Sequence, residues 1–263
     1  MHYNYSLYIK TFKRIVSLSR CIQNILVHTP YLNPKNQLVV VCDDPESAQW
    51  VYDNCGEQIK NGIIGVEYGG ERLGSPGTWA KAIELSRKRG YDFTIVFEDD
   101  CWPYKDGWLD LVDDFFVVSK CKHPLINFCP TKPWDGVYGD EPTTIINGSG
   151  VRVDEEERIG QYLVQKSNID SFVFTATKNS LFDGEPHIVD PWFKFYGYWH
   201  SAMTLRLMKQ GKVPWRNSHI KQLEPYIFAC DFLSKCLPEC GMNRLEKLNW
   251  AHKQKDWAKY IQL

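Results

Sequence analysis

Three acidic residues follow a run of apolar residues in the stretch TIVFEDDCWPYKDGW, residues 94–108. Glu98 and Asp100 stand two apart at the end of a predicted strand, so we expect their side chains on one side and Asp99 on the other. Two carboxylates on one side repel each other unless a cation joins them. Mg²⁺ or Mn²⁺ suits this position, because these ions take oxygen ligands and leave open positions for substrate phosphates. The pattern predicts a divalent-metal site that holds a diphosphate and neutralises its growing charge as it leaves.

Two other interpretations of the acidic stretch stay open. A strand that ends in ordinary solvated acids would show the same three residues. A glycosidase also uses two carboxylates, but they flank a bond at roughly 5 to 9 Å separation and usually come from different elements. Acids on a single strand that follows a buried-type run fit a metal site better.

The elements that would position these acids alternate between strand and helix. Short apolar runs predict strands at 5–12, 37–44, 62–70 and 93–100, and amphipathic patterns predict helices at 15–26, 45–59 and 77–90. Gly90 stands where it can end the third helix. This alternation predicts an α/β fold with a mostly parallel, doubly wound sheet flanked by helices. The strand ends at 10–14, 43–44 and 98–100 are then expected to face one crevice.

The second half of the chain has a weaker rhythm. Residues 131–170 contain Pro, Gly and the acidic run 154–157, which predicts a long excursion with a solvated acidic face. A strand is expected at 170–179, then a helix within 196–215 that Gly211 ends, then an edge strand. We expect one catalytic domain, 1–263, with a nucleotide-sugar-binding half at 1–115, an acceptor-binding half at 116–225 and a helical extension at 226–263.

Composition bounds the partners and the compartment. A formal net charge of -1 excludes a global basic field that would attract nucleic acid or anionic membrane. The N-terminus lacks the apolar region of a secretory signal, and no stretch approaches the length of a membrane span, so we expect a cytoplasmic protein with no membrane partner. Nine scattered cysteines favour buried thiols in a reducing compartment, and Cys230, Cys236 and Cys240 lack the close pairs of a structural zinc site.

Several motifs in this order resemble the GT-A fold glycosyltransferases, specifically the family 2-like group. They are KTFKR (10–14), VVVCDDPES (39–47), the stretch 74–110 that contains FEDD, and YGYWHSAMTLRLMKQGK (196–212). The resemblance covers residues 5–115 and, more loosely, 170–215. It implies a GT-A (Rossmann-like) sheet with a C-terminal helical elaboration, Mn²⁺ or Mg²⁺, and a nucleotide sugar as donor, with a UDP-sugar expected first.

The resemblance also implies site residues. Thr11 and Arg14 would lie near the nucleotide, and Asp43 or Asp44 would read the base and ribose. Beyond these, the implied donor-site residues are Arg72 and Lys81 for the base or diphosphate, Glu98 and Asp99 for the ribose or metal, and Asp100 as the metal ligand.

The catalytic base is the point where the chain departs from the family. An acidic pair is usual where this chain has Trp199 and His200. His200 can act as a base at neutral pH, Asp190 or Glu185 could replace it, and a retaining mechanism would need no dedicated base. His219 is a further metal-ligand candidate, as a late His is in several GT-A enzymes. A structural histidine is the alternative for both His residues.

The predicted activity is the metal-dependent transfer of a hexosyl or pentosyl group to a hydroxyl acceptor. The compact chain also resembles bacteriophage-type enzymes, and some phages glycosylate hydroxymethylated pyrimidines in their own DNA, which would place this protein in the host cytoplasm. A C-terminal basic and aromatic surface could bind double-stranded DNA, with a solvated helix face as the alternative. Its members would be Lys209, Lys212, Trp215, Arg216, Lys221, Lys247, Trp250, Lys253, Lys255, Trp257 and Lys259.

Other acceptors and other functions remain alternatives at this stage. A glycan or a protein could accept the sugar instead of DNA. A nucleotidyltransferase shares a Rossmann-like sheet and acidic metal sites, but it normally has a Gly-rich loop after the first strand, and KTFKRIVSL has no glycine. A binding module without catalysis would not require the Glu98 and Asp100 pair.

Overall fold

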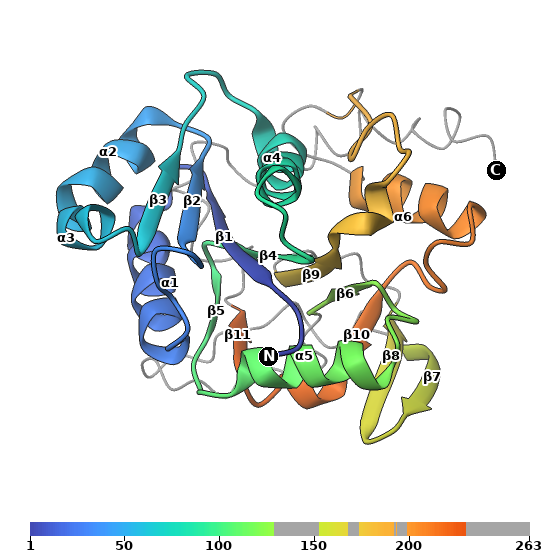
Figure 1. The fold of residues 1–263 in the computed structure, drawn as a ribbon. Helices are drawn as coiled ribbons and strands as arrows, with labels where there is room; N and C mark the ends of the chain where they lie inside the picture. The colour runs from blue at the N-terminus through green and yellow to red at the C-terminus, as the bar shows by residue number, and fades with distance from the viewer. Residues whose placement is uncertain (129–152, 168–173, 192, 194–198, 230–263) are drawn as a thin grey trace.

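A mixed nine-stranded sheet forms the centre of the part of the chain that the structure describes (Figure 1). This computed structural model describes residues 1–128, 153–167, 174–191, 193 and 199–229. The strand order is β3-β2-β1-β4-β9-β6-β10-β8-β7, and β5 and β11 form a separate two-stranded sheet.

The first half of the chain builds the parallel part of the sheet. Its elements are β1 (Tyr5–Thr11), α1 (Ile15–His28), β2 (Leu38–Cys42), α2 (Pro45–Asn54), α3 (Gly56–Lys60), β3 (Ile64–Glu67), α4 (Gly74–Lys88) and β4 (Phe93–Glu98). These four strands run parallel to one another, so the predicted α/β alternation is confirmed. The predicted helix 45–59 is two helices, because the chain breaks at Cys55, whose N–H closes α2 on the carbonyl of Val51.

The second half completes the sheet mostly through antiparallel pairs, although β10 pairs parallel with β6. Its elements are β5 (Cys101–Pro103), α5 (Trp108–Val118), β6 (Leu125–Asn127), β7 (Val153–Ile159), β8 (Tyr162–Ser167), β9 (Phe174–Lys178), the 3₁₀ turn η1 (Asn179–Phe182), α6 (Trp199–Lys209), β10 (Ser218–Ile220), η2 (Lys221–Leu223) and β11 (Ile227–Ala229). β9 inserts between β4 and β6 and is antiparallel to both. Gly211, with φ of 68°, follows α6 as predicted.

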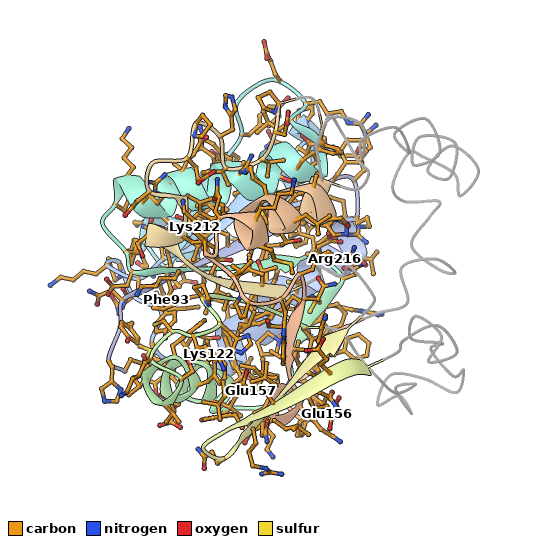
Figure 2. The ribbon with its side chains drawn as sticks, turned by 90° about the vertical axis from the view of Figure 1, so that its right-hand side faces the viewer. Phe93, Lys122, Glu156, Glu157, Lys212 and Arg216 are labelled. Carbon is orange, nitrogen blue, oxygen red and sulfur yellow. The ribbon has the colours of Figure 1, made fainter. Side chains whose placement is uncertain are left out.

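Two predictions for the second half need correction. The acidic run 154–157 has the solvated face that was predicted, with Glu155 57% exposed. It lies in β7, however, which pairs with β8 in a hairpin at the sheet edge, where charged side chains can reach water. The rest of the predicted excursion, 131–152 and 168–170, lies outside the described residues. Glu157 of this strand pairs with Lys122 (Figure 2). The strand after α6, β10, is not an edge strand, because the β7–β8 hairpin extends the sheet beyond it.

Helices cover both faces of the parallel strands, which explains their continuous apolar runs. In β1, Leu7 and Ile9 face the core beneath α1 and α5, whereas Tyr8 faces the core beneath α4 and α6. The alternation of β-strand side chains therefore serves two cores rather than a core and solvent. This double cover leaves the carboxyl edge of the strands as the place where polar side chains gather.

The remaining expectations on compartment and cysteines are tested only in part. Within the described ranges, no helix is long and apolar enough to cross a membrane. The described cysteines are free thiols, and all but Cys121 are buried. The group at Cys230, Cys236 and Cys240 lies outside the described residues.

Candidate functional site

The ends of β2, β1 and β4 lie side by side at the carboxyl edge of the sheet. Lys10 is the register partner of Glu98, and Thr11 is the partner of Cys42, immediately before Asp43. Adjacent strands lie about 4.8 Å apart, so the residues that follow these ends are within side-chain reach of one another. The structure thus brings together the three strand ends that the sequence predicted would face one crevice.

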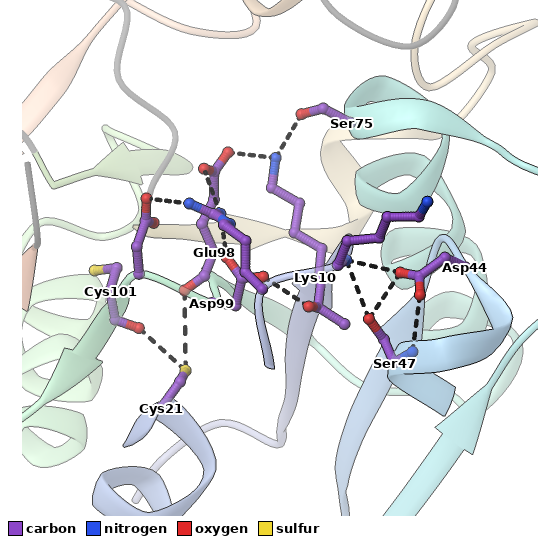
Figure 3. A network of polar contacts seen from close by, with 12 residues as sticks. Lys10, Cys21, Asp44, Ser47, Ser75, Glu98, Asp99 and Cys101 are labelled. Atoms are coloured by element: carbon purple, nitrogen blue, oxygen red, sulfur yellow. Dashed lines mark hydrogen bonds and ion pairs between the residues drawn. The ribbon is translucent and has the colours of Figure 1, made fainter. Parts of the chain in front are cut away.

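The three acids form one cluster around Arg14. Figure 3 labels Glu98 and Asp99 of this cluster, together with Lys10. The guanidinium of Arg14 donates to Asp100 Oδ2 at 2.6 Å, pairs with Asp99, and lies 3.8 Å from Glu98. Thr11 Oγ1 donates to the second oxygen of Asp99 at 2.6 Å. The expectation that Asp99 points away from its neighbours is wrong, because β4 ends at Glu98 and residues 99–100 form a turn in which strand alternation no longer applies.

A second cation, Lys10, belongs to this cluster and was missing from the predicted site. Its Nζ lies 2.6 Å from Glu98 and 2.7 Å from the hydroxyl of Ser75 at the start of α4. The same ammonium lies 5.6 Å from the ring centre of Trp199 at the start of α6. The signal in the sequence was a lysine within the buried run YSLYIKT, because a buried ammonium needs a carboxylate partner.

With all three carboxyls ionised the cluster carries one net negative charge, because three carboxylates then face one guanidinium and one ammonium. Asp99 and Asp100 are both fully buried. Burial raises the pKa of each carboxyl, and the charge of Arg14 opposes this rise without cancelling it. One oxygen of Asp100, Oδ1, has no hydrogen-bond partner among the described residues. The cluster therefore lacks one unit of positive charge and has a carboxylate oxygen ready to accept it.

These features fit a hard divalent cation. Mg²⁺-type ions are commonly held by one or two carboxylates, with waters and substrate phosphates as the other ligands. Among the described residues no three His, Cys, Asp or Glu side chains converge in a way that could hold a metal ion. Glu98, Asp99 and Asp100 thus suit an ion that the substrate helps to hold, rather than a closed protein site.

His219 is not gathered with the acids. It lies on β10, which is three strand spacings from β4, or roughly 14 Å across the sheet. The side chain is buried, with Nε2 3.3 Å from Glu224 and the ring packed edge-on to Phe128 at 5.5 Å. These contacts are those of a structural histidine.

Asp43 and Asp44 hold the loops around the cluster. Asp43 accepts the backbone N–H groups of Leu73 at 2.5 Å and Gly74 at 3.0 Å, where α4 begins. Asp44 caps α2 by accepting from the N–H of Ser47 at 2.8 Å, and it also accepts from the N–H of Lys13 at 2.8 Å. Both aspartates are buried, so they fix the positions of loops from three segments at this edge.

Arg72 and Lys81 lie farther out. The guanidinium of Arg72 stacks over the ring of Phe12 at 4.1 Å and lies 3.8 Å from Asp43. Lys81 pairs with Glu67 at the end of β3 at 3.1 Å. Arg72 therefore borders the loop after β1, whereas Lys81 belongs to the outer strand end and not to the acid cluster.

The start of α6 lies beside the cluster. Trp199, which Lys10 approaches, precedes His200, and the two rings pack edge-on at 5.5 Å. His200 is half-buried in the first turn of α6. Asp190 lies in the exposed loop before this helix, where its carbonyl accepts from the N–H of Phe193 at 3.0 Å.

Glu185 is held at the opposite end of α6. Its carboxylate pairs with Lys212 at 2.5 Å and with Arg206 at 3.4 Å. Burial acts to raise the pKa of Glu185, but the hydrogen bonds from Lys212 and Gln210 lower it overall. His200 and Arg206 are six residues apart, or about 9 Å along the helix axis, so Glu185 is tied away from the first turn.

Comparison with known proteins places this arrangement in a known fold. No protein-family model matches the chain, and no curated protein matches its sequence. Among solved structures, a GalNAc-T7 structure with UDP, GalNAc and Mn²⁺ superposes with a TM-score of 0.58 at 14% identity, covering 83% of this chain and 42% of that chain.

Two further structures agree with this match. S. aureus TarS gives a TM-score of 0.56 at 15% identity, covering 98% of this chain and 43% of that chain. The mannosyltransferase PcManGT from Pyrobaculum calidifontis, solved with GDP-Man and Mn²⁺, gives 0.53 at 13% identity, covering 80% of this chain and 53% of that chain. The chain thus spans only about half the length of the proteins it matches. Together with the mixed, mostly parallel sheet between helices, these matches show that the chain has the fold of the GT-A glycosyltransferases.

Proposed function

We propose that this protein is a metal-dependent glycosyltransferase that moves a sugar from a nucleotide sugar to a hydroxyl acceptor. The observation that carries the proposal is the buried acid cluster at the carboxyl edge of β4, with its net negative charge and the free oxygen of Asp100. Ligands of open α/β sheets bind at this edge. Two of the similar proteins were solved with Mn²⁺ and a nucleotide or nucleotide sugar, which supports the same donor class here.

In this proposal Asp100 and Asp99 hold the metal, with Glu98 oriented by Lys10. The bound ion would neutralise the charge that develops on the leaving diphosphate. Asp43 and Asp44 keep the loops after β1 and before α4 in place, and Arg72 borders the nucleotide. Residues 1–115 would bind the donor and residues 116–225 the acceptor.

His200 is the proposed base. The imidazole would take the proton of the acceptor hydroxyl while the hydroxyl oxygen bonds to the anomeric carbon and the bond from that carbon to the diphosphate breaks. Support comes from its position in the first turn of α6, next to the tryptophan that Lys10 approaches. Asp190 in the preceding loop is the second candidate. His200→Ala should lower the rate much more than donor affinity, and an equal loss of both would assign His200 a structural role.

Hydroxymethylated pyrimidines in double-stranded DNA are the acceptors we propose to test first, with glycans and proteins as the comparison. Lys209 and Lys221 of the predicted basic surface are exposed. Lys212 is engaged with Glu185, and Trp215 packs edge-on to His123 at 5.0 Å, so these two serve the fold. The members of this surface after residue 229 lie outside the described residues. Transfer to hydroxymethylated but not to unmodified DNA, weakening steeply with salt, would support this acceptor.

A thermal-shift panel tests the donor site. UDP, GDP, CDP, TDP and their sugar conjugates are each added with and without Mn²⁺ to the wild type, Asp100→Asn and Asp106→Asn. Asp106 is the matched control, because its carboxyl is 77% exposed and, in the described part of the chain, contacts His28 rather than the acid cluster. Stabilisation by one nucleotide that requires both Mn²⁺ and Asp100 would establish the donor site. Release of pyrophosphate from a nucleoside triphosphate would indicate a nucleotidyltransferase. No thermal shift with any nucleotide would refute both proposed activities, glycosyltransferase and nucleotidyltransferase.

A further inference from the structure

We propose that Arg14 is an internal counter-cation, which holds Asp100 in the metal-free protein and must release it when a divalent ion binds. Metal and guanidinium would then compete for the same carboxylate, and Arg14 would set how tightly the protein holds its metal. This inference rests on the proposed metal site and names the residue that regulates it.

The position of Arg14 makes it part of the cluster rather than a surface residue that happens to reach it. It stands directly before α1 with φ of -113° and ψ of 60°, outside the helical region, and only 6% of it is exposed. From there the guanidinium touches Asp99 and Asp100 and approaches Glu98. Its planar fork of five N–H donors can serve several carboxylates at once, which a lysine ammonium cannot do with the same geometry.

The contact with Asp100 is the one that conflicts with metal binding. Arg14 takes Oδ2 of this carboxylate at 2.6 Å, while Oδ1 is buried without a hydrogen-bond partner. Mg²⁺ binds oxygen ligands at about 2.0 to 2.1 Å. An ion on Asp100 would therefore lie within a few ångströms of the guanidinium, and repulsion between the two cations is strong in a water-poor site. Each cation weakens the binding of the other.

The second cation of the cluster differs from Arg14 in this respect. The ammonium of Lys10 binds Glu98 at 2.6 Å and Ser75 at 2.7 Å, and no contact joins it to Asp100 among the described residues. A metal ion on Asp100 can leave the Lys10 and Glu98 pair in place. Arg14 is thus the cation whose departure lets the metal approach, and its fork is then available to a phosphate group of the donor, which suits bidentate recognition.

Metal binding by the full chain, measured without nucleotide, tests the competition. Mn²⁺ is titrated by calorimetry and by electron paramagnetic resonance into the wild type, Arg14→Gln, Arg14→Lys and Arg20→Gln. Arg20 is the matched control because it lies in α1, the helix that Arg14 directly precedes, and is exposed. We expect Arg14→Gln to bind Mn²⁺ at least about tenfold tighter than the wild type, since removing one nearby positive charge from a buried site changes affinity by this order. Arg14→Lys should fall between them, and Arg20→Gln should match the wild type.

A second measurement uses only the wild type, because Arg14→Gln leaves the acids with less positive charge and could unfold. Nitrogen-15 NMR follows the guanidinium of Arg14 during titration with diamagnetic Mg²⁺. Its N–H protons should be protected from exchange in the metal-free protein and should lose that protection as Mg²⁺ saturates the site. Unchanged protection at saturation would overturn the inference.

The outcomes separate this inference from the proposed function. If the wild type binds Mn²⁺ and Arg14→Gln binds it equally or more weakly, Arg14 supports the metal ligand and the competition is wrong, while the glycosyltransferase proposal stands. If no variant binds Mn²⁺ with or without UDP or GDP, the metal site itself is wrong and both proposals fail.

Discussion

The buried pair of Lys10 and Glu98 offers a quantitative test of how the acid cluster is held. Lys10→Met removes an ammonium that is 5% exposed and lies 2.6 Å from a carboxylate that is 19% exposed. Breaking a buried pair by deleting one partner costs about 3 to 5 kcal/mol. Glu98 keeps some contact with water, and Arg14 lies 3.8 Å away as a second partner, so we expect a loss of about 2 to 3 kcal/mol in the free energy of unfolding.

The measurement is a double-mutant cycle by urea denaturation at pH 7, with Lys10→Met, Glu98→Gln and the double variant. The coupling energy between the two sites should be about 1 to 3 kcal/mol, because the contact at 2.6 Å is lost when either group is removed. Lys88→Met, an exposed lysine on α4, is the matched control and should change stability by less than about 0.5 kcal/mol. A Lys10→Met loss below about 1 kcal/mol, or a coupling energy near zero, would refute the view that this pair organises the cluster.

Three further predictions concern the frame around the site. Asp113 accepts hydrogen bonds from the N–H of His2 at 2.6 Å, from the N–H of Tyr3 and from the hydroxyl of Tyr5. These bonds lower the pKa of Asp113, although burial acts to raise it. Asp113→Asn should therefore lower the free energy of unfolding by about 1 to 3 kcal/mol, measured by urea denaturation at neutral pH. Because the folded pKa is the lower one, that stabilisation is present above the ordinary carboxyl range and is lost as pH falls through the folded pKa. Burial lowers the pKa of His123 despite its contact with Glu157 at 3.3 Å. The free energy of unfolding should therefore fall as pH drops below the usual histidine pKa of about 6.5. Between pH 7.5 and 5.5, the urea midpoint of His123→Gln should fall less than that of the wild type. Lys13 has φ of 55°, so Lys13→Gly should leave the melting temperature nearly unchanged whereas Lys13→Val should lower the free energy of unfolding by more than about 1 kcal/mol.

The elements of the first half followed from short-range patterns. The apolar stripe that begins at Ile15 and the runs of β1, β2 and β4 are set by the periodicity of side chains, which each segment carries within itself. Gly90 has φ of 76° just beyond α4, where a residue with a side chain would be strained. That these strands run parallel was predictable for the same reason, because the helices between them supply the crossover connections that parallel pairing needs.

The second half was less predictable because its pairing joins distant segments. β9 lies between β4 and β6, and β10 lies between β6 and β8. No local sequence pattern determines which strand pairs with which in the sheet. From the sequence alone, the acidic run of β7 is therefore predicted as a loop and the short strand β10 as an edge strand.

The candidate site divides in the same way. The residue types of Glu98, Asp99 and Asp100, and their place at the end of a buried run, already pointed to a divalent cation and a diphosphate, because carboxylate oxygens are the ligands that hard cations take. Their convergence on Arg14, the inclusion of Lys10 and the exclusion of His219 came only from the folded chain. The physical reason is that the charge balance of a buried cluster depends on side chains from several strands, and strand order and the turn after β4 decide which of them meet.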